Sequence, residues 1–208
     1  DRAFSFYYSE NLEALEKAGA ELVKISSIND RCLPDIDALY IGGGFPETNL
    51  DLLVNNPDLL SSLKEKSILG LPIYAECGGL IYLAESIEYN ERNYKLSGVL
   101  PFKIKMSNKP CGHGYVDAVV DEDNRYFPKN LRIKAHEFHY SYICEPDENL
   151  GTCLKINVGA GAINGRDGMC LNNVFATYLH IHSAGCPQWA EGLVNQAIIY
   201  KNEQSRKK

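Results

Sequence analysis

The sequence lacks several features that would point to particular classes of protein. No apolar run is long enough to cross a membrane, and no C-x-x-C pair suggests a zinc ribbon or a redox site. No G-x-x-x-x-G-K-[ST] loop is present to cradle a nucleotide phosphate. Positive charge is also scarce, because 27 acidic residues outweigh 21 basic ones. We therefore expect neither membrane insertion nor nucleic-acid binding through a basic surface.

What is present is an ordinary composition for one globular domain. Of the 208 residues, 45% are hydrophobic and 23% are charged, which is enough for a sizeable core. Seven cysteines at irregular spacings, with no signal peptide, favour free thiols in a reducing cytoplasm. The chain starts at Asp1 on an apolar segment, so we interpret residues 1–208 as one domain of a longer protein.

The first part of the chain predicts an α/β fold. Residues 3–8, 21–26 and 36–41 are apolar enough for strands, and a helical apolar spacing that ends at Gly19 lies between the first two. This order is typical of a mostly parallel central sheet flanked by helices. Residues 94–120 mix apolar–polar alternation with apolar runs, which indicates additional antiparallel strands.

Cys77 follows a short apolar strand predicted at residues 73–75. Gly78 and Gly79 permit a sharp turn after it, and residues 80–86 continue as an apolar, helix-like run. A cysteine on such a turn projects from the sheet, near a helix N-terminus that favours the thiolate. The same geometry serves the serine of hydrolase nucleophile elbows. Two interpretations remain open, a nucleophile and a buried structural cysteine beside a glycine turn.

A second glycine-rich turn follows the strand predicted at residues 36–41. Its sequence, Gly42-Gly43-Gly44-Phe45-Pro46-Glu47, exposes backbone N–H groups at the edge of the sheet where open α/β proteins bind ligands. A plain tight turn would need only one glycine. We expect the backbone N–H groups of Gly44 and Gly78 to form an oxyanion hole, and Gly43 and Glu47 to line a substrate pocket.

A stretch of mixed polar and aromatic residues, residues 136–142, predicts a strand beside that pocket. Alternation divides its side chains between two faces: His136, Phe138 and Tyr140 on one, Glu137, His139 and Ser141 on the other. We take His136, His139 and Tyr140 as pocket candidates. The His-x-x-His spacing has no further ligand cluster beside it, so no metal is expected.

Two histidines end the last predicted strand, residues 174–182, before a helix expected at residues 187–200. His180 and His182 share one face of an extended segment, so both are candidates for the base that a nucleophilic cysteine needs. In a parallel sheet they would lie at the same edge as Cys77. Together these parts suit attack on an amide through a thioester.

Six motifs in order resemble one family along nearly the whole chain. They are Ala3-Phe4 with Phe6-Tyr7-Tyr8, Gly42 to Glu47, Ala75-Glu76-Cys77-Gly78-Gly79-Leu80, Gly114-Tyr115, His136 to Ser141, and Ala176 to His182. The sequence is similar to the glutamine amidotransferase domains of cobyrinic acid, hydrogenobyrinic acid and nickel-sirohydrochlorin a,c-diamide synthases. This resemblance implies a class I glutamine amidotransferase-like, flavodoxin-like fold.

The resemblance also implies a chemistry and partners. Cys77 would attack the glutamine amide, and His180 would raise its nucleophilicity. An amino-terminal synthetase domain of the same chain would bind ATP and Mg²⁺ and activate two carboxylates of a tetrapyrrole held across the domain interface. No cofactor is implied within residues 1–208 themselves.

One departure from the wider class stands out. Many class I amidotransferases carry a glutamate two residues after the histidine, where this chain has His182. The group that orients His180 therefore stays unassigned by the sequence. Two alternatives also remain, a cobyric acid synthase-type amidotransferase and a noncatalytic binding domain of the same fold.

Overall fold

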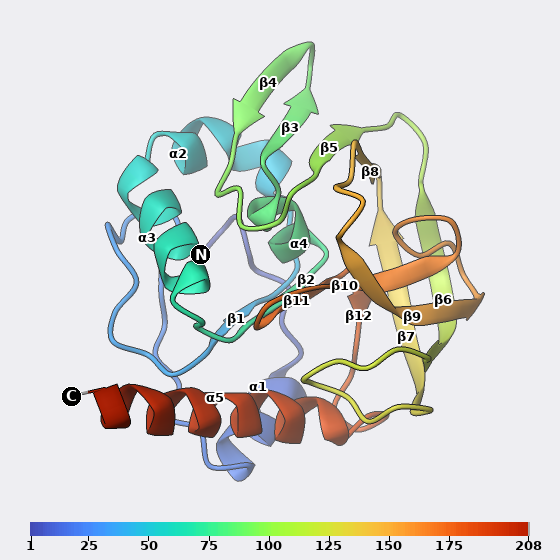
Figure 1. The fold of residues 1–208 in the computed structure, drawn as a ribbon. Helices are drawn as coiled ribbons and strands as arrows, with labels where there is room; N and C mark the ends of the chain where they lie inside the picture. The colour runs from blue at the N-terminus through green and yellow to red at the C-terminus, as the bar shows by residue number, and fades with distance from the viewer. Residues whose placement is uncertain (208) are drawn as a thin grey trace.

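The computed structural model describes residues 1–207, which form a curled central sheet with helices on both faces (Figure 1). Within these residues the sheet has eight strands. In spatial order they are β1 (Leu39–Ile41), β2 (Ile73–Glu76), β11 (Val174–Thr177), β10 (Arg166–Leu171), β9 (Gly151–Val158), β6 (Gly112–Val120), β7 (Arg132–His139) and β12 (Leu179–His180).

Helices cover the two faces of this sheet in separate layers (Figure 1). One layer holds η1 (Pro46–Asn49), α2 (Leu50–Val54), α3 (Pro57–Ile68) and α4 (Gly78–Leu83), and the other holds α1 (Ser9–Lys17) and α5 (Gln188–Lys207). Each layer closes over its own apolar cluster. Leu63 and Leu80 belong to the first cluster, and Leu15 and Trp189 belong to the second. Burial of both clusters fixes the sheet between the layers.

A smaller sheet of four strands lies beside the main one. Its order is β4 (Arg92–Lys95), β3 (Ser86–Tyr89), β5 (Lys103–Met106) and β8 (Ser141–Cys144). The β3–β4 hairpin projects at the top of Figure 1. Only Tyr140 separates β7 from β8, so one stretch of chain passes directly from the main sheet to the small one.

The prediction of a mostly parallel sheet is wrong. In the described residues only the β1–β2 and β2–β11 ladders of the main sheet are parallel, and the remaining ladders are antiparallel. The reason lies in the connections. A parallel pair needs a long crossover, usually a helix, and no helix occurs between Leu83 and Gln188. The main-sheet strands that follow one another in that region, β6 with β7 and β9 with β10, are joined without a helix and pair antiparallel.

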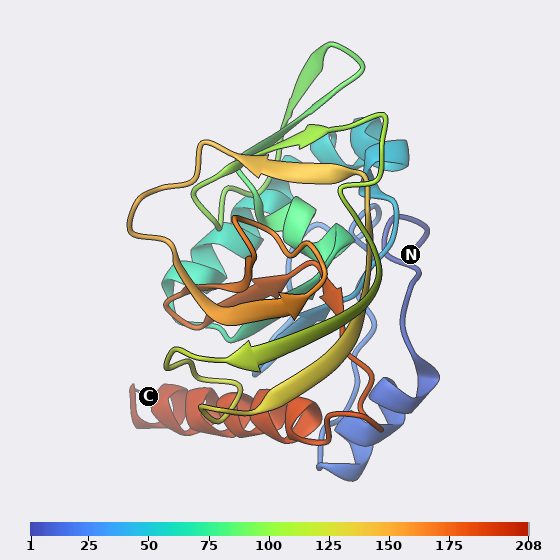
Figure 2. The ribbon, with the colours of Figure 1, turned by 90° about the vertical axis from the view of Figure 1, so that its right-hand side faces the viewer.

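The antiparallel part curls into a half-barrel that returns to the carboxyl end of β11 (Figure 2). The strand predicted at residues 174–182 is broken at Tyr178, and β12 pairs with β7 rather than continuing beside β2. The side chain of Asp167 accepts the Tyr178 backbone N–H at 3.3 Å, and the Tyr178 hydroxyl meets Ser141 Oγ at 2.9 Å. These contacts satisfy Tyr178 outside a ladder and let the chain change direction there.

Two strands predicted near the amino terminus are absent. Residues 3–8 form only an isolated bridge, in which Phe6 and Gly43 exchange backbone hydrogen bonds of 3.0 and 3.2 Å. Residues 21–26 pair with no strand, and Val23 is 55% exposed. A cavity of about 950 Å³ separates this segment from β1 and from α5. A strand needs a hydrogen-bonded neighbour, and this segment has none within residues 1–207.

Other predicted boundaries change by a few residues. The helix expected at 80–86 is α4, which starts at Gly78 and ends at Leu83, because Ser86 already belongs to β3. The last helix is longer than expected and reaches Lys207. Alternation along β7 is confirmed, since Ala135, Glu137 and His139 are buried while their neighbours are less so.

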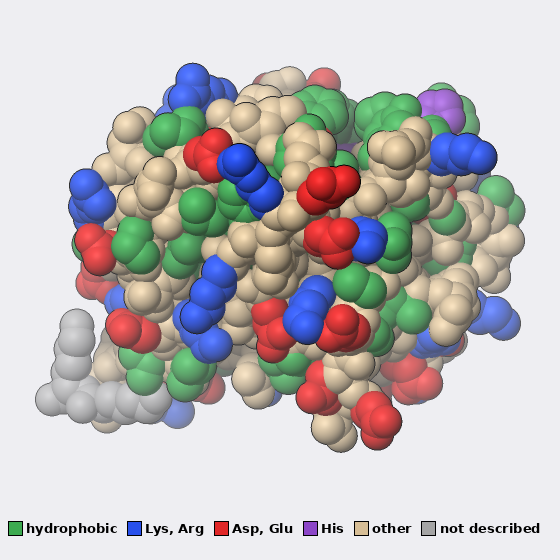
Figure 3. Space-filling model, turned by 90° about the horizontal axis from the view of Figure 1, so that it is seen from above, with side chains coloured by type: hydrophobic (Ala, Val, Ile, Leu, Met, Phe, Trp, Pro, Cys, Tyr) green, Lys and Arg blue, Asp and Glu red, His purple; other side chains and the backbone are tan. Residues whose placement is uncertain are grey.

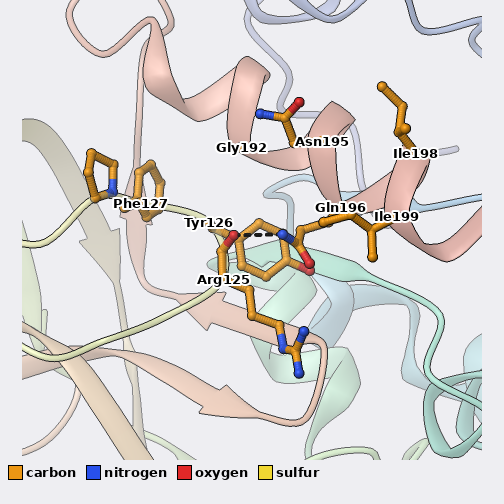
Figure 4. A pocket seen from close by; sticks show the side chains of 9 residues that line it. Arg125, Tyr126, Phe127, Gly192, Asn195, Gln196, Ile198 and Ile199 are labelled. Atoms are coloured by element: carbon orange, nitrogen blue, oxygen red, sulfur yellow. Dashed lines mark hydrogen bonds between the residues drawn. The ribbon is translucent and has the colours of Figure 1, made fainter.

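A second cavity, of about 510 Å³, lies between α5 and the loop at residues 125–128 (Figure 4). Gln196 closes one side of it by donating a 2.9 Å hydrogen bond to the Arg125 carbonyl. Its lining includes Tyr126, Phe127 and Ile199 but none of the candidate site residues. It is therefore a gap between α5 and this loop, away from the candidate site.

The surface matches the modest net charge of the sequence. On the face seen in Figure 3, acidic and basic side chains are interspersed rather than gathered by sign. Among the residues that the structure describes, no helix combines the length and apolar character that crossing a bilayer requires.

Candidate active site

Cys77 stands on a strained turn between β2 and α4. Its φ of 47° and ψ of −100° lie outside the regions that L residues usually occupy, a strain typical of functional turns. The turn is held from both sides: the Cys77 N–H donates to the Thr177 carbonyl at 2.7 Å, and its carbonyl accepts the Ile81 N–H at 3.1 Å. The Cys77 sulfur is directed toward the Phe138 carbonyl of β7, 3.6 Å away.

Two positions near Cys77 require glycine, because neighbouring atoms lie too close for a side chain. A Cβ on Gly79 would collide with the Ile41 carbonyl oxygen, so α4 could not pack against β1. A Cβ on Gly43 would lie 2.5 Å from His180 Cε1. These positions explain why the turns after β1 and β2 are rich in glycine.

His180 ends β12 and lies against Cys77. It is 6% exposed and packs edge-on against the Phe6 ring at 4.7 Å between centroids. Burial lowers the pKa of His180, but the Cys77 thiol and the Glu76 carboxylate beside it outweigh burial and raise the pKa to about 10. His180 is therefore placed to hold a proton beside the Cys77 sulfur.

Glu76 lies directly before Cys77 and is 1% exposed. Its Oε2 is 3.7 Å from His180 Nδ1 and accepts a 3.2 Å hydrogen bond from the Tyr40 hydroxyl. Its Oε1 accepts the Ile181 backbone N–H at 3.5 Å. Burial and the charge of Glu76 both raise the pKa of Tyr40, so its hydroxyl stays protonated and remains a donor.

The predicted oxyanion donors are brought together. The space where Gly78 would carry a Cβ lies 3.0 Å from the Gly44 nitrogen and 2.9 Å from its oxygen. Glu47 follows in η1 and is half-buried, and burial raises its pKa. The two glycine turns therefore meet beside Cys77.

The pocket candidates on β7 and just after it lie on two different sides of the strand. His136 faces His180 across the β7–β12 ladder, and burial together with the charges of His180 and His113 lowers its pKa. Tyr140 lies on the same outer side, 37% exposed. His139 lies on the inner side, where it stacks on Tyr178 at 3.8 Å and donates from Nδ1 to the Ser141 carbonyl at 2.8 Å.

His182 is not placed beside Cys77 with His180. Its ring lies 4.7 Å from that of Tyr8, and its Nε2 is 3.8 Å from Glu10. The cause is Asn11 of α1, whose amide donates to the Ile181 carbonyl and accepts the Ser183 N–H, both at 2.7 Å. These bonds pull the segment after His180 toward α1. No group of three or more metal-ligating side chains occurs in residues 1–207.

Sequence reasoning missed Glu76 and Asn11 as neighbours of His180. The available signal was a carboxylate ending an apolar strand, because a buried charge without a partner is costly and usually has one. Asn11 gave no comparable signal, since its helix otherwise presents an ordinary amphipathic pattern.

Solved structures define the class of fold. A crystal structure described as a glutamine amidotransferase covers 94% of this chain with a TM-score of 0.68 at 17% identity. The structure of PurLQS from Thermotoga maritima covers 92% with a TM-score of 0.66 at 16% identity. The fold is therefore the α/β fold of class I glutamine amidotransferases, with a mixed and mostly antiparallel main sheet.

The family follows from sequence. Residues 1–187 match the model of the CobB/CobQ-like glutamine amidotransferase domain, so the chain belongs to that family. It is 42% identical over 190 residues to the cobyrinate a,c-diamide synthase of Magnetococcus marinus. These 190 residues are 91% of this chain and 41% of that protein. The enzyme of that name from Methanothermobacter thermautotrophicus is 39% identical over 95% of this chain and 43% of its own length. The chain thus spans less than half the length of these relatives.

Proposed function

We propose that the chain hydrolyses glutamine through a thioester on Cys77, as the amidotransferase part of a cobyrinate a,c-diamide synthase. The observation that carries the proposal is the contact between His180 and Cys77 on its strained turn, in a chain of this family. A noncatalytic binding domain would have no need of a buried imidazolium beside a cysteine.

The chemistry follows from this pair. The Cys77 thiolate attacks the side-chain amide carbon of glutamine, and the oxyanion is stabilised by the backbone N–H groups of Gly44 and Gly78. The C–N bond then breaks, and the nitrogen leaves as ammonia after taking a proton from His180. Water hydrolyses the thioester with His180 as base, which releases glutamate and restores the thiol.

The glutamine pocket is assigned by position. Gly43 and His136 lie against His180, so we place the substrate beside them. Glu47 offers a half-buried carboxylate next to the oxyanion loop, which suits the ammonium group of glutamine. Tyr140 lies on the exposed outer side of the same strand region, whereas His139 packs beneath it and supports the strand.

The whole enzyme extends beyond this chain. We propose that an amino-terminal synthetase domain binds ATP and Mg²⁺ and activates the a and c carboxylates of cobyrinic acid or a related tetrapyrrole. Ammonia from Cys77 would reach that substrate across the domain interface. We also propose a cytoplasmic setting, which would keep Cys77 reduced.

The test is Cys77→Ser in the full-length enzyme. Glutamine-dependent amidation should be lost, while amidation from added ammonium salt should continue, because free ammonia enters after the thioester step. Mass spectrometry of the product should find amides on the a and c side chains. Amides on other side chains would instead identify a cobyric acid synthase-type enzyme, and full glutamine-dependent activity of the variant would contradict the nucleophile.

A further inference from the structure

The imidazole of His180 has one nitrogen without a hydrogen bond. Nδ1 is fully buried, and no residue among 1–207 lies within hydrogen-bonding distance of it. A buried ring nitrogen without a partner carries a free-energy penalty. The nearest charged group is the Glu76 carboxylate, 3.7 Å away.

The surroundings hold the Glu76 carboxylate in place. Tyr40 donates to Oε2, and the Ile181 N–H donates to Oε1 from the residue that follows His180. The carboxylate of the residue before Cys77 therefore contacts the neighbouring strand β1 and the segment that carries His180. A movement of about 1 Å would bring Oε2 and Nδ1 to charge-assisted hydrogen-bond distance.

His182 does not compete for this role. It is directed toward Tyr8 and Glu10, and the Asn11 hydrogen bonds fix the backbone on both sides of it. Glu137, a second buried carboxylate near the site, has both oxygens bonded to the backbone N–H groups of Ala160 and Gly161. Glu76 is thus the acidic group available to His180.

We propose that Glu76 is a positioning residue, whose carboxylate holds Nδ1 of His180 and leaves Nε2 directed at the Cys77 sulfur. The proposal rests on the proposed function and assigns the group that orients its histidine. The carboxylate also stabilises the imidazolium that forms when Cys77 gives up its proton. It acts through His180 and needs no contact with glutamine.

The experiment compares Glu76→Gln with Glu76→Asp and with a matched control, Glu137→Gln. Glutamine turnover is measured in the full-length enzyme. We expect Glu76→Gln to lower kcat about a hundredfold with KM changed by less than about threefold, because the carboxylate affects the reactive pair and not the binding of substrate. Glu76→Asp, which keeps the charge, should recover part of the loss.

A second readout is independent of the rest of the enzyme. Iodoacetamide alkylation of Cys77, followed by peptide mass spectrometry, is compared with that of exposed Cys32 in the same sample. The Cys77 to Cys32 rate ratio should fall about tenfold in Glu76→Gln, because less thiolate is present. It should stay unchanged in Glu137→Gln, even if that variant unfolds at lower temperature.

Three outcomes would overturn the proposal. The first is an unchanged kcat and an unchanged Cys77 to Cys32 rate ratio in Glu76→Gln. The second is a change in KM alone, with kcat unchanged. The third is an equal fall of the rate ratio in Glu76→Gln and Glu137→Gln. If Glu76→Gln does not fold, a wild-type kcat in Glu76→Asp has the same force. Failure of the proposed function is separate, because it would appear as glutamine turnover by Cys77→Ser.

Discussion

The parallel and antiparallel parts of the main sheet each bury one glutamate beside a histidine, and the two carboxylates differ in the hydrogen bonds that they accept. Glu76, at the end of parallel strand β2, faces the titratable ring of His180 and the Tyr40 hydroxyl. Glu137, on antiparallel strand β7, accepts backbone N–H groups from Ala160 at 2.7 Å and from Gly161 at 3.0 Å. Both side chains are almost fully buried.

This difference separates a structural carboxylate from one poised to act. Burial raises the pKa of Glu137, but the contact with His139 and the two backbone hydrogen bonds outweigh it, so the pKa is lowered overall. Both of its oxygens accept backbone N–H groups, and the histidine beside it, His139, lies 3.9 Å away and stacks on Tyr178. Glu76 also has a histidine beside it, but that histidine, His180, contacts Cys77. Neither burial nor a nearby histidine therefore identifies a functional carboxylate, whereas the contact of that histidine with the nucleophile does.

The largest effect is expected when the histidine beside Glu76 is removed. His180→Ala removes the ring that lies beside both Glu76 and Cys77, so glutamine turnover in the full-length enzyme should fall about a hundred- to ten-thousandfold. Amidation from ammonium salt, measured in the same preparation, serves as the control and should be retained. A loss of both activities would indicate damage to the fold.

Glu137→Ala removes the buried carboxylate from the antiparallel part of the sheet. It leaves the Ala160 and Gly161 amides without their acceptor, which should cost about 3 kcal/mol in the free energy of unfolding. Hydrogen exchange at residues 159–161 should accelerate, because the carboxylate is their link to β7. Denaturant unfolding and exchange measurements check this result. Unchanged exchange there would refute the structural role, and Glu76→Ala, which has no contact with that loop, is the control.

Asp167→Asn extends the comparison to another buried carboxyl group, through the dependence of stability on pH. Burial raises the pKa of Asp167 to about 6, although hydrogen bonds from the Gly168 and Tyr178 amides oppose the shift. A carboxyl group with a raised folded-state pKa contributes stability below its unfolded value of about 4, and this stability is lost as pH rises through 6. The variant should therefore gain about 2 kcal/mol relative to wild type between pH 4 and pH 7.

Thermal unfolding midpoints across that pH range measure the effect. Asp123→Asn is the matched control, because its side chain is 92% exposed and its surface ion pair contributes little. A stability difference for Asp167→Asn that does not vary with pH would show that the wild-type carboxyl group has the same pKa in both states.

The parts of the molecule that follow from local pattern were predictable. The Cys77 turn and the alternation of β7 both depend on neighbouring residues, and both are present. The curl of the sheet was not predictable, because β12 pairs with β7 across a break at Tyr178 that only tertiary contacts explain.

The candidate site shows the same limit. Sequence order places Glu76 beside Cys77, but Ile181, which it binds, is 105 positions away. His180 and His182 share a face only while the strand continues, and Asn11 ends that by binding Ile181 and Ser183. Residues 21–26 have a strand-like sequence but lack a partner strand in the described chain, so local propensity alone overstated their structure.

The most direct test of the account is covalent labelling of Cys77 by a glutamine analogue that carries a diazoketone in place of the amide. The account predicts one label per chain, on Cys77, with labelling suppressed by added glutamine and slowed in both Glu76→Gln and His180→Ala. Exposed Cys32 should stay unlabelled in the same sample. Labelling of Cys32 at a similar rate, or labelling of Cys77 that neither glutamine nor the two variants affect, would contradict it.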